Sequence, residues 1–408
     1  MPRVWWHCVW LEYNMMNSYF ADLHIHVGMS ESGRWVKIPT SRHLTVRSIL
    51  QEAAQRKGMD IVGIVDALSP LVLDDIRQLI AEGELEPASS GGYIYRNSLL
   101  LILGAEVETR EESGGLAHTL AFLPDIKSMT AFSAYMSRFI RNISLSSQNA
   151  HMPLKQLVGI AGSFDSLIVP AHVFTPHKSL YGVCCTRLTQ ILSEKELARL
   201  SAIELGLSAD SDMADRIEEL RSYTFITNSD AHSLDKIARE YNVFTMESLS
   251  FGEIAKTFSR TAGRKVQANY GLDPRLGKYH RTFCTICGFI DDNALMSSVC
   301  PRCGANSLVK GVFDRINEIG DFIEPNHPDH RPQYYYQIPL EFIPGLGKKL
   351  LAKLLAEFDT EMNILHYVTY NALVSVAGNK IADFIIRARE GTADITAGGG
   401  GVYGRVKM

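Results

Sequence analysis

The chain has 408 residues, of which 46% are hydrophobic and 21% are charged, and its formal net charge is -4. No apolar run approaches the roughly 20 residues that a membrane-spanning helix needs, so we expect no membrane contact. The chain also lacks an overall excess of basic residues, so any contact with nucleic acid must be local. At about 100–200 residues per domain, the length predicts two to three domains.

Residues 1–16 read MPRVWWHCVWLEYNMM, and we interpret them as a doubtful leader or a disordered tail. Their apolar stretch is interrupted by polar residues, and no small-residue cleavage site follows, so a secretory signal is not predicted. Met15 and Met16 are both candidate start codons. Seven cysteines without a secretory signal indicate a cytoplasmic protein whose paired cysteines bind metal rather than form disulfides.

Short apolar runs alternate with amphipathic segments from residue 17 to about residue 275. The runs predicted as buried strands are 60–67, 99–108, 165–173, 202–207 and 223–231, and the predicted helices are 45–58, 71–83, 194–200 and 213–222. This alternation predicts parallel βα units, which build either an α/β barrel or an open doubly wound sheet.

Nearly every predicted strand ends in a histidine or a carboxylate. In a barrel, the carboxyl ends of successive strands meet at one rim, so these side chains should converge there, which favours the barrel. The candidate ligands are His24, His26, Asp66, Glu106, His118, His172, Glu204, Asp230 and His232. Imidazoles and carboxylates suit zinc, manganese or iron, and two or three such ions can clamp a phosphate ester. The pattern therefore predicts phosphoester hydrolysis.

Each motif also has a simpler explanation when it is taken alone. His24 and His26 could be two surface histidines of one strand. Asp230 could cap a helix, with His232 as its partner. The recurrence of such residues at consecutive strand ends is what favours a metal site.

The motifs DLHIH, GAEVET followed by His118, VPAH and NSDAH resemble the polymerase and histidinol phosphatase (PHP) superfamily. The resemblance implies a distorted seven-stranded (β/α) barrel with two or three divalent ions, which could be zinc, manganese or magnesium. It implies one ion at His24, His26, Glu106 and Asp230, a second at Glu106, His118 and His172, and a third that involves His232. Glu106 and Asp230 would then fix the ions, while His232 or Asp66 would handle protons.

One position departs from the superfamily pattern. Many members have Asp-His after the second strand, whereas this chain has Asp66-Ala67. The third ion then depends on whether Asp66 itself or His43 supplies the missing ligand.

The segment after the VPAH motif and one tyrosine of the C-terminal tail offer candidates for substrate binding. His177 and Lys178 could contact a phosphate, and Phe174, Tyr181 and Tyr403 could stack on a base. The alternative for each is solvation or ordinary packing.

Residues 276–310 contain two CxxC pairs separated by twelve residues, Cys284 with Cys287 and Cys300 with Cys303. Each pair places two thiolates on one tight turn, and four thiolates close a tetrahedron around zinc. A redox role is the alternative for a single CxxC. Four ligands leave no open position, so we predict a structural zinc ion.

The remainder divides into a connector (311–339), a compact helical segment (340–390) and a glycine-rich tail (391–408) that is flexible by composition. FIPGLGKKLLAKLL and the weaker copy VSVAGNKIADFI have the form of a helix-hairpin-helix. In such hairpins, glycine lets helix amides approach a DNA phosphate without reading sequence. The predicted DNA contacts are Gly345, Gly347, Lys348, Lys349, Gly378 and Lys380. A plain helical hairpin is the alternative.

The order of barrel, four-cysteine module and hairpin segment resembles the endonuclease Q family of DNA repair nucleases. The match extends over nearly the whole chain from about residue 17, and PAHVFTP, ELGLSAD, GLDPRLGKYH and GGGGVYG carry it most closely. The resemblance implies incision on the 5′ side of uracil, hypoxanthine, xanthine and abasic sites, with the lesion swung out of the stack. We expect activated water to attack the phosphorus, leaving a 3′-hydroxyl and a 5′-phosphate. Damaged DNA is the expected partner, and a sliding clamp is a further candidate.

Two other functions fit parts of the sequence. One is a small-molecule phosphatase that acts on a substrate like histidinol phosphate or a nucleotide, and it leaves the cysteine module and the hairpins without a purpose. The other is a DNA-binding protein with an inactive barrel, which only Asp66-Ala67 favours.

Overall fold

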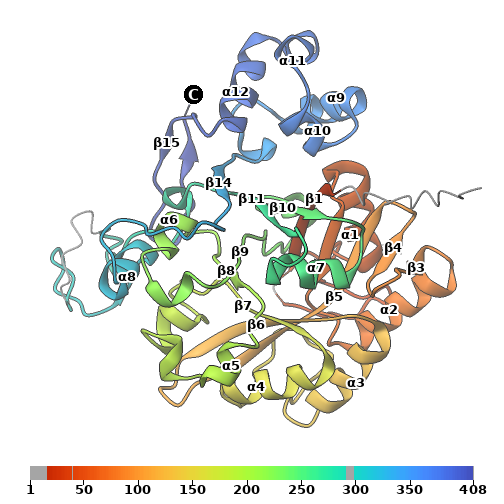
Figure 1. Cartoon of the computed structure of the whole chain (residues 1–408). Coiled ribbons are helices and arrows are strands. Elements are labelled where there is room, and N and C mark those ends of the chain that lie inside the picture. Colours follow the sequence, from red (N-terminus) through yellow and green to blue (C-terminus); the bar gives the residue numbers. More distant parts are fainter. Residues whose placement is uncertain (1–15, 39, 291–297, 408) are drawn as a thin grey trace, which may run out of the picture.

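The computed structural model describes residues 16–38, 40–290 and 298–407, so the doubtful leader lies almost wholly outside the described residues. Residues 17–38 and 40–275 form a mixed α/β barrel (Figure 1). Its main sheet runs in the order β14-β11-β10-β1-β2-β5-β4-β3, with β6 beside β5 and β7 beside β6. Its strands are β1 (Asn17–Ile25), β2 (Ile61–Ile64), β3 (Leu85–Pro87), β4 (Tyr93–Tyr95), β5 (Leu99–Arg110), β6 (Leu116–Leu123), β7 (Leu167–Pro170), β10 (Tyr241–Met246), β11 (Lys265–Gly271) and β14 (Gln333–Tyr336).

A separate strand pair, β8 (Ile203–Glu204) with β9 (Phe225–Ile226), closes the remaining gap of the barrel. Ser201 N donates to Ile168 O of β7 at 2.8 Å on one side. On the other side, Thr227 N donates to the side chain of Asn242 in β10 at 2.9 Å. Just after β9, Ala231 N donates to His24 O at 3.2 Å and His26 N donates to Ala231 O at 3.1 Å, so a parallel bridge to the end of β1 completes the closure.

Helices cover the outside of the barrel. They are α1 (Val46–Gln51), which continues as a π-helical stretch (Glu52–Lys57), α2 (Pro70–Ala81), α3 (Ile126–Met136), α4 (Leu154–Ala161), α5 (Glu194–Leu197), α6 (Ser211–Ala214) and α7 (Phe251–Ser259). Helix α7 buries Phe251, Ile254 and Phe258 against apolar residues of the strands. No helix in the described ranges is long and apolar enough to cross a membrane.

The expectation of a barrel is confirmed, but the expectation of parallel βα units throughout is not. Strands β1, β2 and β5 are parallel to one another, whereas β5, β6 and β7 pair antiparallel. Only residues 111–115 connect β5 to β6. A connection of that length can form a hairpin but is too short for the crossover that parallel strands require.

The helical segment beyond residue 340 consists of α9 (Lys348–Phe358), α10 (Glu361–His366), α11 (Tyr370–Ala377) and α12 (Asn379–Arg389). It lies at one end of the barrel, next to β14, which adds to the barrel sheet parallel to β11 (Figure 1). The rings of Tyr241, Tyr270 and Tyr335 stack in series, and His366 of α10 packs edge-on against Tyr270 at 5.0 Å. These aromatic contacts tie the helices to the barrel.

Two C-terminal expectations differ from the structure. The predicted connector 311–339 contains helix α8 (Val312–Ile319) and strand β14. The tail, predicted to be flexible, forms a hairpin of β15 (Ile395–Thr396) and β16 (Arg405–Val406). Backbone hydrogen bonds from Gly398 to Arg275 and from Gly404 to Leu276 hold it on the segment that follows the barrel. The glycine content of the tail predicted a flexible segment, but these hydrogen bonds hold the tail in one position.

Candidate active site

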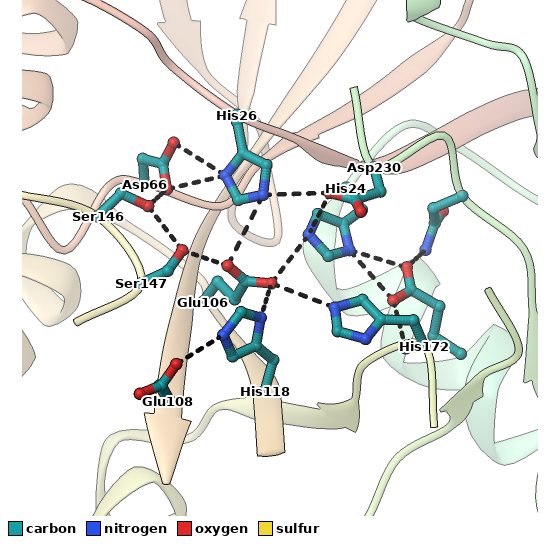
Figure 2. A network of polar contacts seen from close by, with 12 residues as sticks. His24, His26, Asp66, Glu106, Glu108, His118, Ser146, Ser147, His172 and Asp230 are labelled. Atoms are coloured by element: carbon teal, nitrogen blue, oxygen red, sulfur yellow. Dashed lines mark hydrogen bonds and ion pairs between the residues drawn. The ribbon is translucent and has the colours of Figure 1, made fainter. Parts of the chain in front are cut away.

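Strand β1 begins the site with His24 and His26. Residues two apart on a strand share one face, so both imidazoles point into the same space. Strand β5 adds Glu106 by the same alternation, together with Glu108, which lies directly opposite His118 of β6. All five side chains are buried, and Figure 2 shows them meeting in one network.

Glu106 lies at the centre of this network. Its Oε1 is 2.7 Å from His118 Nδ1, 3.4 Å from His24 Nε2 and 3.5 Å from His172 Nε2. Its Oε2 faces the other way, 3.7 Å from His26 Nε2. One carboxylate therefore has imidazole nitrogens on both sides, as a bridging ligand requires.

Asp230 closes the network from the loop after β9. Its Oδ1 lies 3.3 Å from His26 Nε2 and 3.6 Å from His24 Nε2. Asp230 has φ +45° and His172 has φ +32°, which is unusual for residues other than glycine. Backbone strain of this kind concentrates at functional sites, where the surrounding structure enforces it. His232 lies beside Asp230, and its Nδ1 is 2.9 Å from Asp230 O.

The chemistry of these donors fits divalent metal ions. Three groups have ligand atoms within 4.8 Å of one another: His24, His26 and Glu106; Glu106, His118 and His172; and His26, Asp230 and His232. His24 Nε2 and His118 Nδ1 are buried and lie near Glu106, but neither has the geometry of a hydrogen bond to it or to another described residue. A buried polar atom without a partner is costly, and a bound cation would satisfy both nitrogens.

Carboxylates behind the histidines fix their orientation. The second ring nitrogen of each faces an oxygen, with His24 Nδ1 3.0 Å from Glu204, His26 Nδ1 3.1 Å from Asp66 and His118 Nε2 3.3 Å from Glu108. Such partners set the tautomer of a metal-binding imidazole and raise its basicity.

Asp66 therefore does not have the position expected of a ligand or a proton carrier. It points at the outer nitrogen of His26 and also accepts hydrogen bonds from Val27 N and Ser146 Oγ. Among residues 16–38, 40–290 and 298–407, neither Asp66 nor His43 belongs to a group that could hold a metal. His43 is exposed. The geometry of the described residues therefore supports neither expectation.

The charges of the site favour cation binding. Burial alone would raise the pKa of Glu106, but His118 and Lys37 outweigh it and hold that pKa well below its ordinary value. The same competition lowers the pKa of Asp230, where His24 opposes the effect of burial. Burial and the neighbouring His26 lower the pKa of His232 to about 4, so its ring is neutral at physiological pH and keeps a lone pair.

The network opens into a pocket of about 650 Å3. The cationic side chains that line it are Lys37, Lys178, Lys236, Arg239 and Lys278. Tyr279 and Tyr403 form part of its wall, and the Lys278 ammonium lies 5.0 Å and 5.7 Å from their ring centroids. A cleft with cationic groups around buried carboxylates attracts a polyanion and concentrates it at the site.

The five predicted substrate-binding residues separate into two sets. His177, Lys178 and Tyr403 line the pocket, although Lys178 Nζ is paired with Glu108 at 2.8 Å. Phe174 and Tyr181 are only 1% and 0% exposed and stack on each other, so they cannot stack on a base here. Their apolar sequence context is equally typical of core residues, and the structure places them in the core.

Several residues of the site were missing from the sequence prediction. Lys37, Ser146 and Ser147 come from loops without a recognisable motif, and Lys37 Nζ lies 3.0 Å from Glu106 Oε2. Glu108 had a usable signal, since it is two residues from Glu106 and must share its face.

The four cysteines converge as predicted. Cys284 Sγ lies 3.7 Å from Cys303 Sγ, and Cys287 Sγ lies 3.6 Å from Cys300 Sγ. At a Zn–S distance of about 2.3 Å, the edge of a tetrahedron is about 3.8 Å, which matches this spacing. Gly288 and Gly304 follow the two pairs with φ +68° and +73°, a conformation that each tight turn requires.

The hairpin segment has the predicted glycines at helix starts. Gly345 and Gly378 have φ +84° and +79°, ahead of α9 and α12. Gly347, Lys348, Lys349 and Lys380 are exposed there. A short 3-10 turn, Leu340–Phe342, stands where the first hairpin helix was expected, so the helix-hairpin-helix assignment stays a prediction.

A buried carboxyl next to the barrel is not part of the network. Glu240 Oε1 accepts a hydrogen bond from Leu272 N at 2.8 Å, while Oε2 has no partner among the described residues. Burial raises the pKa of Glu240 to about 8.

Replacing Glu240 by glutamine should stabilise the protein in a pH-dependent way. The folded pKa lies above the unfolded value of about 4.3, so the wild type is fully stable below that value and loses stability as the pH rises towards 8. Glutamine cannot ionise, so the advantage of the variant should grow to about 3 kcal/mol at pH 7. Thermal unfolding at pH 5 and pH 8 measures it, with the exposed Glu112→Gln as control. An advantage that stays constant with pH would contradict the burial of a neutral carboxyl.

No protein-family model matches the chain. A protein of Bacillus subtilis, uncharacterized protein YqxK, is 43% identical over 394 residues, which cover 96% of this chain and 100% of that protein.

Two crystal structures share both sequence and fold with the chain. The lesion-specific endonuclease PfuEndoQ from Pyrococcus furiosus is 33% identical, with a TM-score of 0.82 and coverage of 96% of both chains. Endonuclease Q in complex with a 27-mer duplex that has an abasic lesion at the active site is 32% identical, with a TM-score of 0.82 and coverage of 96% of this chain and 97% of that one. Because identity and fold extend together over nearly the full length, the chain belongs to the endonuclease Q family.

Proposed function

We propose that this protein is a metal-dependent, lesion-specific DNA endonuclease. The observation that carries the proposal is the Glu106-centred cluster of imidazoles and carboxylates, which opens into a pocket lined by cationic side chains. The family relatives supply the substrate class, since one is lesion-specific and one holds an abasic-site duplex. A hydrolytic site and a polyanion-binding pocket occur together in one cleft, which is what a nuclease requires.

Two ions would be held by the cluster. His24, His26 and Glu106 would hold one, together with Asp230, whose Oδ1 faces both histidines, and Glu106, His118 and His172 would hold the other. Zinc suits this donor set, with manganese and magnesium as alternatives. When bound, such ions polarise the phosphate, activate water and neutralise the charge that develops on the leaving oxygen.

The remaining residues of the site orient groups and handle protons. Glu204, Asp66 and Glu108 hold the histidine rings in the tautomers that present a lone pair to the cluster. His232 lies at the pocket edge, with Nδ1 against Asp230 O, which leaves Nε2 as the basic nitrogen. With a pKa of about 4, His232 is neutral, so its Nε2 can accept a proton from the attacking water and, once protonated, can pass that proton to the leaving 3′-oxygen.

The pocket has room for a nucleotide that has left the duplex. Its volume of about 650 Å3 is in the range of a drug-sized ligand site. Tyr279 and Tyr403 offer ring surfaces at its wall. Extrusion costs least at abasic sites and at mispaired bases such as uracil, hypoxanthine and xanthine, which are the products of base deamination. We propose these as the substrates, with incision on the 5′ side of the lesion.

The accessory segments would position the DNA. The four cysteines would bind a structural zinc ion, because no ligand position is left for substrate. The amides at the starts of α9 and α12, with Lys348 and Lys349, would bind backbone phosphates without regard to sequence.

Replacing Lys348 and Lys349 together by alanine should weaken binding to damaged and undamaged duplex equally. Loss of two phosphate contacts should lower the slope of log Kd against log salt by about 1.8. Fluorescence anisotropy at several salt concentrations measures this slope. The matched control replaces Lys155 and Lys195, exposed on α4 and α5 at the opposite end of the molecule from α9 in Figure 1. Equal slopes in both double variants would contradict a DNA contact at α9.

A lesion panel tests the function itself. End-labelled duplexes with one uracil, hypoxanthine, xanthine or abasic site are incubated with the protein and a divalent ion, beside an undamaged duplex. Cutting of the damaged strand at the lesion, with the undamaged duplex intact, is the expected result. Cutting of all duplexes alike would contradict lesion specificity, and hydrolysis of small phosphate esters alone would favour a phosphatase.

A further inference from the structure

A second cavity lies at the opposite end of the barrel strands from the Glu106-centred cluster. It is lined by residues at the starts of β7, β8 and β9 and at the end of α7. Ser201 and Thr224, which belong to its wall, stand just before β8 and β9. Glu204 ends β8 and Asp230 follows β9, so a ligand in this cavity would not touch the candidate active site.

Two arginines bring positive charge to this cavity. Arg199 follows α5 and lies over Gly162, where a Cβ would be only 2.7 Å from Arg199 Nη1. Arg260 ends α7 with φ +55°. Its guanidinium donates to Thr224 Oγ1 and, at 2.9 Å, to Ser222 O. A glycine thus leaves room for one guanidinium, and hydrogen bonds fix the other.

No carboxylate of the described residues neutralises either arginine. The cavity wall contains no aspartate or glutamate, and neither guanidinium belongs to an ion pair within the described ranges. Glu196 lies in the field of Arg199, but its carboxylate accepts hydrogen bonds from Ser193 N and Oγ. Burial lowers the pKa of Arg260, and no described acid opposes that effect. A partly desolvated cation without a counter-charge is costly, and an anion in the cavity would offset this cost.

The rest of the wall suits an aromatic group. Leu197, Leu200 and Phe258 give it an apolar part, and Tyr223 adds a ring. Tyr223 Oη donates to Leu197 O at 3.2 Å, and Thr224 Oγ1 donates to Phe258 O at 2.7 Å. These hydrogen bonds tie the start of β9 to α5 and α7. The wall is therefore held in place before a ligand arrives, which lowers the entropic cost of binding.

The size and charge of the cavity limit the ligand that it can take. Its volume of about 430 Å3 is in the range of sites for small molecules. A phosphate monoester carries a charge of about -1.5 to -2 at pH 7, which two guanidinium groups balance, and arginine binds phosphate through two parallel hydrogen bonds. We propose that this cavity is a second binding site, for a small aromatic phosphate monoester of the size of a nucleoside monophosphate. The site is independent of the proposed function.

Hydrogen exchange measured by mass spectrometry tests the site on the full-length protein as purified. The probes are AMP and UMP, one purine and one pyrimidine monophosphate. At least one of them should slow amide exchange in residues 197–201, 222–224 and 255–260, whereas adenosine and uridine should not. Equal protection of these segments by inorganic phosphate would overturn the aromatic part of the proposal. Protection by neither nucleotide, or protection only at residues of the candidate active site, would overturn the proposal as a whole.

Variants of the two arginines test the role of the charge. Arg199→Gln and Arg260→Gln should each raise the nucleotide concentration at half-maximal protection about 10- to 100-fold, as for loss of a hydrogen bond to a charged group. Arg199 is exposed, so Arg199→Gln keeps the proposal testable if Arg260→Gln does not fold. An unchanged midpoint in folded Arg199→Gln would overturn the proposal.

Lys256→Gln is the matched control. Lys256 is an exposed cation on α7 that pairs with Glu253 at 2.8 Å and lies outside the cavity wall, so its loss should leave the midpoint unchanged. The measurement involves no DNA. A protein that binds nucleotide in this cavity but does not incise a damaged duplex would therefore refute the proposed function and leave the second site standing.

Discussion

Replacing Glu106 by glutamine should abolish incision and release metal from the barrel. Glutamine keeps the shape of the side chain but loses the negative charge, while His118 Nδ1 remains 2.7 Å from one of its terminal atoms. Charge stabilisation by catalytic metals is worth several kcal/mol, and each about 1.4 kcal/mol is tenfold in rate, so the loss should be on the order of 1000-fold or more. Single-turnover incision of an abasic-site duplex and metal analysis measure the two effects.

Two other glutamates serve as controls for Glu106. Glu108→Gln alters the partner of the outer nitrogen of His118 and the ion pair with Lys178 but leaves Glu106 in place, so it should lower metal affinity or activity by about 10- to 100-fold. The side chain of Glu112 is 86% exposed, and Glu112→Gln should leave metal content and incision rate unchanged. If Glu106→Gln retained its ions and its rate, Glu106 could not be the bridging ligand.

Replacing Cys300 by serine should remove one zinc ion per chain. It should weaken binding to duplex DNA while the barrel keeps its hydrolytic activity. Structural zinc binds with roughly 10–16 kcal/mol, and that energy folds the small module around it. Losing one of four thiolates should therefore unfold the module while the barrel keeps its own core. We expect hydrolysis of a small phosphodiester to persist, while affinity for damaged duplex falls at least about tenfold. Metal analysis, a chromogenic phosphodiester and fluorescence anisotropy provide the measurements.

Cys185 supplies the control for this variant. It is buried outside the cysteine cluster, and its thiol already donates to Leu180 O, so a serine hydroxyl can replace it. Cys185→Ser should retain all ions and full DNA affinity. An unchanged zinc content in Cys300→Ser would show that the four cysteines do not form the expected site.

The residues of the central cluster could be predicted from the sequence because each obeys a local rule. His24 and His26 share a face by strand alternation, and His172 and Asp230 follow strand ends that meet at one rim of a barrel. The four cysteines are equally local, since each CxxC is one turn. Local pattern and resemblance together predicted residues whose side chains lie close together in the structure.

Other parts of the structure depend on long-range geometry. The antiparallel β5–β6 pairing follows from a short connection whose strand β6 was not recognised. Asp66 follows a strand end, as the predicted ligands do. The register of β1 and β2, however, places its carboxylate against His26 Nδ1, on the side of the ring away from the cluster. Lys37 lies on a loop with no motif, and only the packing of Val36 brings its ammonium to Glu106. No local pattern could have revealed these three.

The position of the C-terminal tail also could not be predicted from the sequence. Its glycines predicted flexibility, yet hydrogen bonds to Arg275 and Leu276 place Tyr403 at the wall of the pocket. Composition describes the freedom of the isolated chain, whereas tertiary contacts decide where the segment lies.

The central claim is that the Glu106-centred cluster performs metal-dependent incision at a lesion. One measurement tests it most directly: a duplex with a single abasic site is incubated with chelator-treated protein, with and without added divalent ion, and the product ends are mapped. We predict no incision without the ion, and with it one cut on the 5′ side of the lesion that leaves a 3′-hydroxyl and a 5′-phosphate. Incision that survives chelation, or cuts scattered along the duplex, would contradict the account.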